Sequence, residues 1–347
     1  MADAPARKNA FVLGKGGAGV LPSLLSDRGH FVLKTIVMLS VAIGMAGAFP
    51  AASRAAGAAP GQPSAQAAER DDEIIVTGSR NRDDAVADFV EAVTVETDDQ
   101  IARFATPLCP ASFGLPPEQN EAIEARLRAI AAYLGIGAAA GGCRPNVVVI
   151  VAEQGGDFVH RLRRERPGLF NALALADIRA IMRQTGPVRA WQTVEPRGAD
   201  GRPMRRISFV PSPGGPPRYV PNGHELTGVV PSLTSRATRQ DLSLSFVVFD
   251  LDAIEGLTLL QIADHAAMRA LARTGAIGLP ARRSILTLFS DRTAGGPPAA
   301  ALTNWDAAYL HALYRTANIV AAAQQRSNIS RTMTRALELA SDGRQPR

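Results

Sequence analysis

The sequence is 347 residues long and 46% hydrophobic, which is enough to bury a sizeable core in one or two domains. Its net charge is +6, but all three lysines lie within the first 34 residues, and residues 1–57 account for most of the excess charge. Beyond them, arginine clusters such as Arg163–Arg166 contain no aromatic residues that could stack on bases. The composition therefore argues against a nucleic-acid partner.

A secretory signal is predicted over residues 32–57. Arg28 and Lys34 precede an uncharged, mostly apolar run over residues 35–49, and small residues with Ala-x-Ala sites follow it. This is the order of the three regions of a signal peptide. The run is shorter than the roughly 20 residues of an ordinary membrane span. We therefore expect cleavage, a periplasmic or secreted location and no permanent membrane span, with an uncleaved anchor as the alternative.

Residues 1–31 form an unusually long lead before a signal. We expect that translation begins near residue 32 and that this lead results from a start codon placed too early. The lead contains Gly14-Lys15-Gly16-Gly17-Ala18-Gly19, which matches the G-x-G-x-x-G phosphate loop. Such a loop needs a long helix after it, whereas Pro22 and the signal follow here. No nucleotide or other cofactor is predicted.

A flexible linker rich in Ala, Gly, Pro, Ser and Gln is predicted over residues 58–72, and a folded domain over residues 73–342. The first elements expected in that domain are a strand at Ile74–Thr77, a short helix with Val86, Phe89, Val90 and Val93 on one face, a strand near 101–104, a helix over 117–134 that ends at Gly135, and a buried β-branched strand at Val147–Val151.

The second half of the domain is expected to contain both helices and strands. Its expected elements are helices near 157–165 and 175–183, a hairpin of 190–194 with 206–210 around Asp200-Gly201, a strand at 244–249, and helices over 257–273, 305–315 and 328–340. Residues 211–240 are expected to form a long Pro/Gly-rich loop, because their prolines interrupt regular structure. The whole pattern predicts a single α+β domain with a mixed sheet and packed helices.

Two cysteines, Cys109 and Cys143, flank the predicted helix 117–134. In an oxidising compartment an even number of cysteines predicts a disulfide, which would stabilise the domain by about 3–4 kcal/mol. Two unpaired buried thiols are the alternative. No C-x-x-C spacing and no nearby histidine accompany the pair, so metal binding by these thiols is not predicted.

The ordinary catalytic signatures are absent from the sequence. It contains no G-x-S-x-G, S-x-x-K or H-E-x-x-H motif. Catalytic residues are therefore unknown at this stage. An exported hydrolase with an unrecognised site is one alternative, with His265, Asp250, Asp252 and His311 as possible contributors that no spacing selects.

The C-terminal third nevertheless has a recognisable order of parts. They are the strand Ser245–Asp250, the helix Leu260–Ala272, the turn Ser284-Ile285-Leu286, and Leu302-Thr303-Asn304-Trp305-Asp306 followed by Leu310 and Leu313-Tyr314. This order resembles the zincin-type metallopeptidases, in which a helix with H-E-x-x-H-A-L-G precedes a Ser-Ile-Met-like turn and an L-T-x-x-D…L-x-x-L-Y helix. An earlier segment resembles secreted zincin-like bacterial proteins in its helix around Phe89-Val90-Glu91, its Arg103-x-x-x-Pro107 strand, its helix ending near Gly135 and its Pro145-Asn146-Val147-Val148-Val149 run. The likeness covers roughly residues 74–315 and implies a zincin-like fold.

The resemblance fails at the residues that carry zincin chemistry. Aligned on Ala270-Leu271, His265 takes the first zinc-ligand position, Ala266 replaces the catalytic glutamate and Arg269 replaces the second histidine. Zinc hydrolysis needs both histidines and the carboxylate, and a guanidinium cannot ligate a cation. The resemblance therefore implies a pseudoenzyme without metal. His265 and Arg269 share a helix face, which allows anion binding; a packed helix with Arg269 on a carboxylate is the alternative.

Residues 72–80, Asp-Glu-Ile-Ile-Val-Thr-Gly-Ser-Arg, resemble the segment near the mature N-terminus of TonB-dependent outer-membrane receptors. In those proteins the segment pairs as an added strand with the energy-coupling partner. Ile74, Ile75, Val76 and Thr77 are thus either the partner strand of an adaptor or the first strand of the domain's own sheet. The leading expectation is an exported, non-catalytic domain that binds an unidentified protein or ligand of the cell envelope.

Overall fold

The computed structural model describes residues 71–225, 235–275, 283–290 and 298–341. By its internal contacts the chain divides into two units, residues 1–77 and 78–347. Residues 71–77 of the first unit are described, as the beginning of a helix. The predicted lead, the predicted signal and residues 58–70 of the predicted linker lie outside the described residues.

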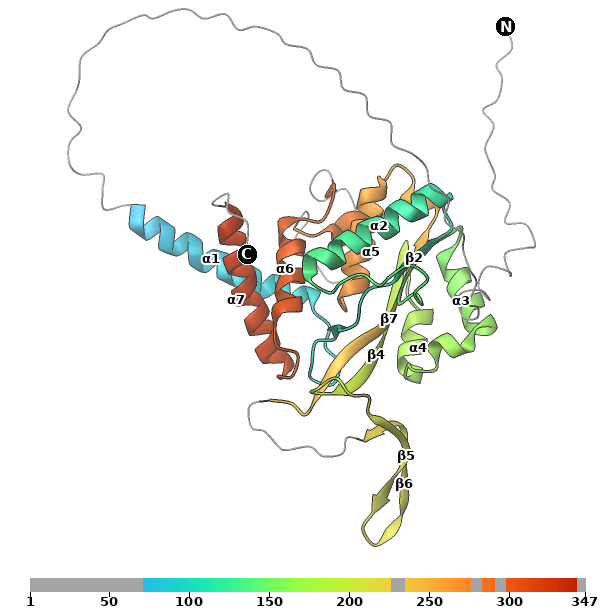
Figure 1. The fold of residues 1–347 in the computed structure, drawn as a ribbon. Helices are drawn as coiled ribbons and strands as arrows, with labels where there is room; N and C mark the ends of the chain where they lie inside the picture. Colours follow the sequence, from blue (N-terminus) through green and yellow to red (C-terminus); the bar gives the residue numbers. More distant parts are fainter. Residues whose placement is uncertain (1–70, 226–234, 276–282, 291–297, 342–347) are drawn as a thin grey trace, which may run out of the picture. The chain divides into compact units, whose positions relative to one another are not determined.

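The second unit contains both helices and strands, and its first helix begins in the first unit (Figure 1). The α-helices are α1 Asp71–Val93, α2 Pro117–Leu134, α3 Gly155–Glu165, α4 Leu175–Met182, α5 Leu259–Leu271, α6 Asn304–Arg315 and α7 Ala322–Ser341; the short 3-10 helices are η3 Pro167–Phe170, η4 Asp252–Ile254 and η5 Ile285–Phe289. The strands are β1 Arg103–Phe104, β2 Pro110–Phe113, β3 Val147–Ala152, β4 Val188–Gly198, β5 Arg205–Ser212, β6 Gly215–Glu225 and β7 Thr238–Asp250.

A mixed five-stranded sheet forms the centre of the second unit. Strands β2, β3 and β7 pair in that order and run parallel, and β1 pairs parallel with the first part of β7. Strand β4 pairs antiparallel with β7 along almost all of its length. The prediction of an α+β domain with a mixed sheet is thus confirmed. Strand β3 is buried on both faces, as the unbroken Val147–Val151 run predicts.

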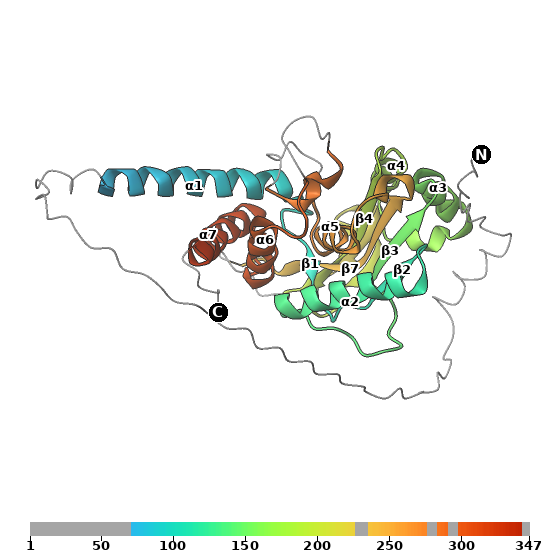
Figure 2. The same ribbon diagram turned by 90° about the horizontal axis from the view of Figure 1, so that it is seen from above.

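Helices cover both faces of this sheet. Helices α2 and α5 lie on one side, and α3 and α4 lie on the other (Figures 1 and 2). On the α5 side, Val247 and Phe249 enter the main hydrophobic core, and the Ser245 hydroxyl donates to the Ala270 carbonyl oxygen (2.8 Å). On the α3 side, Trp191 stacks between Phe170 and Phe246, with ring centroids 5.7 and 4.7 Å away. Each face of the sheet therefore has its own apolar layer.

Helix α2 has the predicted bounds, because its ends carry strong local signals. Pro117 occupies the first helical position, and Gly135 ends the helix in a left-handed conformation with φ 72°. Its apolar residues at alternating steps of four and three, among them Ile123 and Leu127, are buried.

A disulfide joins Cys109 and Cys143, whose Cα atoms are 6.1 Å apart, on either side of α2. The pairing predicted from the sequence is therefore present. Asn146 supports the same junction, since its side chain accepts from the Cys109 N–H (2.7 Å) and donates to the Pro107 carbonyl oxygen (3.0 Å). Disulfides of this kind persist in oxidising compartments.

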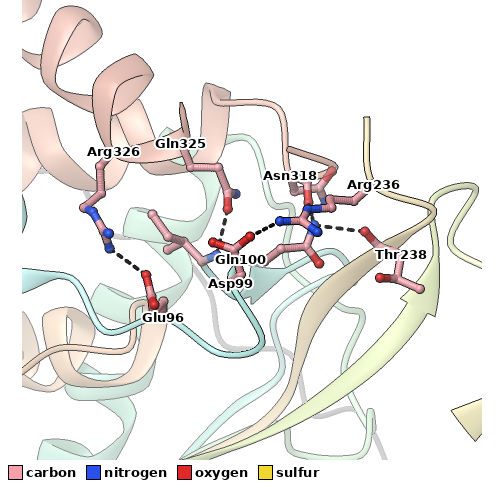
Figure 3. A network of polar contacts seen from close by, with 9 residues as sticks. Glu96, Asp99, Gln100, Arg236, Thr238, Asn318, Gln325 and Arg326 are labelled. Carbon is pink, nitrogen blue, oxygen red and sulfur yellow. Dashed lines mark hydrogen bonds and ion pairs between the residues drawn. The ribbon is translucent and has the colours of Figure 1, made fainter. Parts of the chain in front are cut away.

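A polar network joins the segment after α1 to β7 and α7 (Figure 3). The buried Gln100 side chain donates to the carbonyl oxygens of Thr238 and Asn318 (both 2.9 Å), and the Gln325 side chain accepts from the Ile101 N–H (2.8 Å). Ion pairs of Arg326 with Glu96 and of Arg236 with Asp99 lie at its rim. The bond of Gln325 to Ile101 and the ion pair of Arg326 with Glu96 fix α7 against this segment, although more than 200 residues separate the partners in sequence.

The prediction of a strand at Ile74–Thr77 is wrong for this structure. These residues belong to α1, which continues to Val93. Asp71, Asp72 and Glu73 stand at the beginning of α1, where negative charge favours a helix. Val86 and Val93, in the later turns of the same helix, are fully buried in the core. In this structure the segment is therefore not a strand of the sheet.

The predicted hairpin and the predicted loop are also corrected. Strand β4 pairs with β7 and not with β5, and β5 pairs with β6. Residues 215–225, predicted as loop, are strand β6. Prolines are tolerated there because each strand of a two-stranded ribbon has one unpaired edge, where a missing N–H costs nothing. The turn at Gly201 does form, with its N–H donating to the Gly198 carbonyl oxygen (2.8 Å).

No helix within the described residues combines the length and the apolar character that crossing a bilayer requires.

Candidate functional site

Helix α5 carries the residues that the zincin resemblance singles out, and its position is fixed by its own capping and by the core. The Thr258 hydroxyl accepts from the Gln261 N–H (3.2 Å), and the Gln261 side chain accepts from the Thr258 N–H (3.0 Å). Gln261 also donates to the Ala299 carbonyl oxygen (2.9 Å). Nearly all residues of α5 are buried, so packing sets the direction of each side chain.

His265 lies in an apolar part of the core. It is 3% exposed, and its ring stands edge-on to those of Phe249 and Phe289, at centroid distances of 5.7 and 5.0 Å. Its Nδ1 has no hydrogen-bond partner among the described residues. Burial, together with the nearby charge of Arg269, lowers the pKa of His265 to about 3. The imidazole is therefore neutral at physiological pH.

The residues of this site do not fit the zinc ion that a zincin would hold. Ala266 is fully buried and supplies no carboxylate. In the described ranges no group of three His, Cys, Asp or Glu side chains could hold a metal ion. Arg269, in the second histidine position, carries a positive charge that would repel a cation.

Arg269 instead lines a pocket of about 570 Å³ between α4, strand β4 and the end of α5. We call it the arginine pocket. Its charged lining residues are Arg183, Arg269, Arg273 and Asp177, so the lining has a net positive charge. Of the two residues that share a face of α5, Arg269 lines this pocket and His265 does not.

Neutral acceptors hold the two inner arginines of this pocket. The Arg269 Nη1 donates to the carbonyl and hydroxyl oxygens of Thr274 (both 3.2 Å), and the Arg273 Nη1 donates to the Thr97 hydroxyl. Asp177 is near enough to Arg273 to raise the pKa of its guanidinium against the larger, lowering effect of burial. Arg269 therefore does not meet a carboxylate, contrary to one expectation from the sequence, and both positive charges remain without an ion pair among the described residues.

The outer edge of strand β4 borders the same pocket. In an antiparallel pair, successive residues direct their N–H and C=O groups alternately to the partner strand and away from it. Ser245, opposite Gln192, donates its N–H to the Asn146 carbonyl oxygen on the β3 side. The backbone groups of Gln192 therefore point away from β7, into the edge that β4 leaves open. A β-bulge follows, but its extra residue, Ser243, lies on β7, so the alternation continues along β4 and the backbone groups of Val194 point outward too.

Part of this edge is covered from within the chain. The Gln184 side chain donates to the Ala190 carbonyl oxygen (2.9 Å) and accepts from the Ala190 N–H (3.0 Å), as a neighbouring strand would. Further along β4, the backbone of Pro196 also faces the open edge, but proline has no N–H to leave unpaired there. Between Ala190 and Pro196, the outward groups of Gln192 and Val194 have no partner within the described residues.

A second pocket of about 550 Å³ lies at the carboxyl ends of β3 and β7. We call it the acidic pocket, since Glu153, Asp157, Asp250 and Asp252 line it together with Arg189. Its central charges are paired. The Asp250 carboxylate accepts from the Arg189 Nη1 (2.8 Å) and from the first N–H of α3, at Gly155 (2.6 Å).

The other sequence candidates are not brought together. Asp250 and Asp252 belong to the acidic pocket, and His265 belongs to the core. His311 packs beside Tyr133, with ring centroids 6.1 Å apart, and lines neither pocket. Sequence reasoning missed Arg273, Gln184 and Asp177. The spacing of Arg269 and Arg273 is the one signal that could have suggested a shared site for two of the arginines, whereas no local signal marks Gln184.

Comparison of the chain with protein-family models, with curated proteins and with solved structures finds no match in any of the three.

Proposed function

We propose that this chain is an exported, non-catalytic binding domain on a degenerate zincin-like scaffold, and that the arginine pocket is its binding site. The observation that carries the proposal is that one pocket is bordered both by Arg269 and Arg273, which have no ion-pair partner among the described residues, and by the open edge of strand β4. The predicted signal and the disulfide Cys109–Cys143 support export to the periplasm or beyond.

The pocket favours an extended peptide that carries a carboxylate. The outward N–H and C=O groups of Gln192 and Val194 offer main-chain hydrogen bonds to an added strand. Arg269 and Arg273 lie beside that edge and hold donors that suit a carboxylate, which would form charge-assisted bonds in a partly buried place. An acidic side chain or a C-terminal carboxylate of an envelope protein has this chemistry.

Two features support the absence of catalysis. Ala266 cannot act as a general base, and His265 is neutral and enclosed by aromatic rings. Arg269 contributes positive charge where a zincin would hold its cation. A binding role uses the features that are present and needs none of those that are missing.

The binding test uses the full chain and an array of extended peptides that differ in acidic side chains and in free or amidated C-termini. We expect peptides with a carboxylate to bind and Arg273→Gln to weaken them about tenfold or more, because a charge-assisted bond is lost. Arg331→Gln, which removes the same charge from an exposed position on α7, is the matched control. Equal affinities in the two variants would contradict the proposal.

The catalytic alternative is tested on the same protein. We expect no stoichiometric zinc after purification from metal-rich medium and no turnover of peptide or ester substrates. One tightly held zinc ion per chain, or turnover that His265→Ala abolishes, would overturn the non-catalytic assignment.

A further inference from the structure

Strands β5 and β6 form a ribbon apart from the central sheet. They pair with each other and, in the described ranges, with no other strand. Figure 1 shows the ribbon extending away from the helices and the sheet of the second unit. An isolated two-stranded hairpin is marginally stable in water, so a ribbon of this kind gains most from a surface on which to rest.

Two large aromatic side chains stand on this ribbon in solvent. Phe209 is 60% exposed and Tyr219 is 63% exposed, and they sit opposite each other with ring centroids 5.5 Å apart. Neither ring contributes to the hydrophobic core. Tyrosine and phenylalanine of this exposure are typical of interfaces, and tyrosine suits a boundary between water and an apolar phase.

The end of the ribbon carries no charge. From Ile207 to Pro217 the sequence is Ile-Ser-Phe-Val-Pro-Ser-Pro-Gly-Gly-Pro-Pro. Its four prolines have no N–H, so this turn exposes fewer backbone donors than an ordinary hairpin end. Since each unsatisfied donor opposes entry into an apolar phase, the prolines lower the cost of partial burial there.

Basic residues flank the uncharged end. Arg206 and Arg218 are exposed on the two strands, and neither has an ion-pair partner among the described residues. Arg205 is paired with Glu225 at the base of the ribbon. No Asp or Glu occurs between Arg202 and His224. The free charge of the ribbon is therefore entirely positive, with Arg218 on the turn side of the Phe209–Tyr219 pair and Arg206 on its other side.

We infer that the β5–β6 ribbon is a membrane-docking arm that binds the surface of an anionic phospholipid bilayer. Phe209, Tyr219 and the proline-rich end enter the headgroup region, and Arg206 and Arg218 bind lipid phosphates. The charge complementarity selects this partner over an apolar protein surface, which would leave the two arginines unpaired. The arm is separate from the arginine pocket, so the inference does not rest on the proposed function.

The test measures binding of the full chain to vesicles of phosphatidylcholine and phosphatidylglycerol mixed in equal amounts, and to vesicles of phosphatidylcholine alone. A tryptophan placed at Phe209→Trp reports locally on the ribbon once the emission of the unsubstituted chain, which comes from Trp191 and Trp305, has been subtracted, whatever the predicted signal contributes to total binding. We expect its fluorescence to shift to the blue with the anionic vesicles and not with the neutral ones. Tyr133→Trp, at a 55% exposed position on α2, is the matched control and should show no shift.

The charge contribution is measured in the Phe209→Trp background. Replacing Arg206 and Arg218 with glutamine should raise the lipid concentration at half-maximal shift about fivefold for each charge removed. Arg273→Gln should leave the shift unchanged, which separates this inference from the proposed binding site. The melting temperature should not change, because the ribbon side chains lie outside the core.

The absence of a lipid-dependent shift at position 209 would overturn the inference. So would an equal shift at position 133, which would show general adsorption. A blue shift that appears without vesicles and grows with protein concentration would indicate contact between copies of the chain. If Tyr219→Ser abolished both this shift and a dimer seen in sedimentation, the ribbon would be assigned to a second copy of the chain instead.

Discussion

The arginine pocket and the acidic pocket differ in how their charges are balanced. In the acidic pocket Asp250 is neutralised by Arg189 and also accepts from the first N–H of α3, so the chain satisfies its own charge. In the arginine pocket neutral oxygens of Thr274 and Thr97 orient Arg269 and Arg273 without neutralising them. The difference separates a structural charge pair from charges that are positioned for something else.

The same difference appears in the backbone around each pocket. Gly155 and Gly156 bring the beginning of α3 so close to the Asp250–Arg189 pair that a side chain at either position would contact it. Around the arginine pocket the edge of β4 is covered at Ala190 and open at Gln192 and Val194. One pocket is closed by internal contacts, whereas the other keeps main-chain donors and acceptors for a partner.

The largest expected effect tests whether His265 belongs to the core or to the arginine pocket. In the folded chain its pKa is lowered to about 3, whereas an unfolded histidine has a pKa near 6.5. The folded state therefore binds fewer protons, so its stability is complete above pH 6.5 and falls as the pH drops from 6.5 toward 3, by roughly 5 kcal/mol in total. Urea unfolding at a series of pH values measures this slope.

Replacing His265 with phenylalanine should remove that part of the pH dependence, whatever its effect on absolute stability. Replacing the exposed His160 with phenylalanine should keep it. A His265→Phe variant with the original slope would place His265 in a polar, solvent-connected site and would weaken the separation of the core from the pocket.

The second prediction breaks the charge pair of the acidic pocket. Asp250→Ala leaves Arg189, whose side chain is 12% exposed, without its carboxylate and leaves Gly155 without its acceptor. We expect a loss of about 2–4 kcal/mol in the free energy of unfolding. Asp200→Ala breaks a surface pair with Arg202 and should cost less than about 1 kcal/mol. Similar losses in the two variants would show that the acidic pocket is as open as the surface.

Most of the fold follows from local sequence signals. The bounds of α2 come from Pro117 and Gly135, and β3 comes from an unbroken run of β-branched residues. The errors lie where partners are distant in sequence. Strand β4 looks like half of a local hairpin, but its partner β7 begins 40 residues after β4 ends. Whether β4 pairs with β5 or with β7 depends on burial of the apolar residues on both paired strands, which no local pattern encodes.

The candidate site, like the fold, was predictable only where the signal is local in sequence. Arg269 and Ala266 could be singled out because the order of parts around α5 resembles a known family. The arginine pocket, which Arg269 lines, could not be predicted, because it depends on α4, on the register of β4 and on the turn after α5. Gln184 illustrates the limit: its role is set by a contact with Ala190 that arises from the path of the chain between α4 and β4.

The third prediction sharpens the contrast in backbone packing. A Cβ at Gly155 would lie 2.7 Å from Asp250 Oδ1 and 2.9 Å from Arg189 Nη1, so the charge pair would have to shift. We expect Gly155→Ala to destabilise the fold by about 1–2 kcal/mol, although alanine is the better helix former. Gly168→Ala, where no atom lies within 4 Å of the new Cβ, is the control and should cost nothing. Equal free energies of unfolding in urea for the Gly155→Ala and Gly168→Ala variants would show that the Asp250–Arg189 pair can shift without loss of stability.

The smallest expected effect concerns the cover on the edge of β4. Gln184→Ala removes two hydrogen bonds to Ala190 that face the arginine pocket, where water can replace them, so the loss of stability should be about 1 kcal/mol. The same change lengthens the open edge by one outward-facing residue, and carboxylate peptides should bind about fivefold more tightly. Gln324→Ala, on the exposed face of α7, should change neither quantity. If affinity falls while stability falls, Gln184 contacts the peptide and is part of the site; if affinity rises, Gln184 competes with the peptide for the edge.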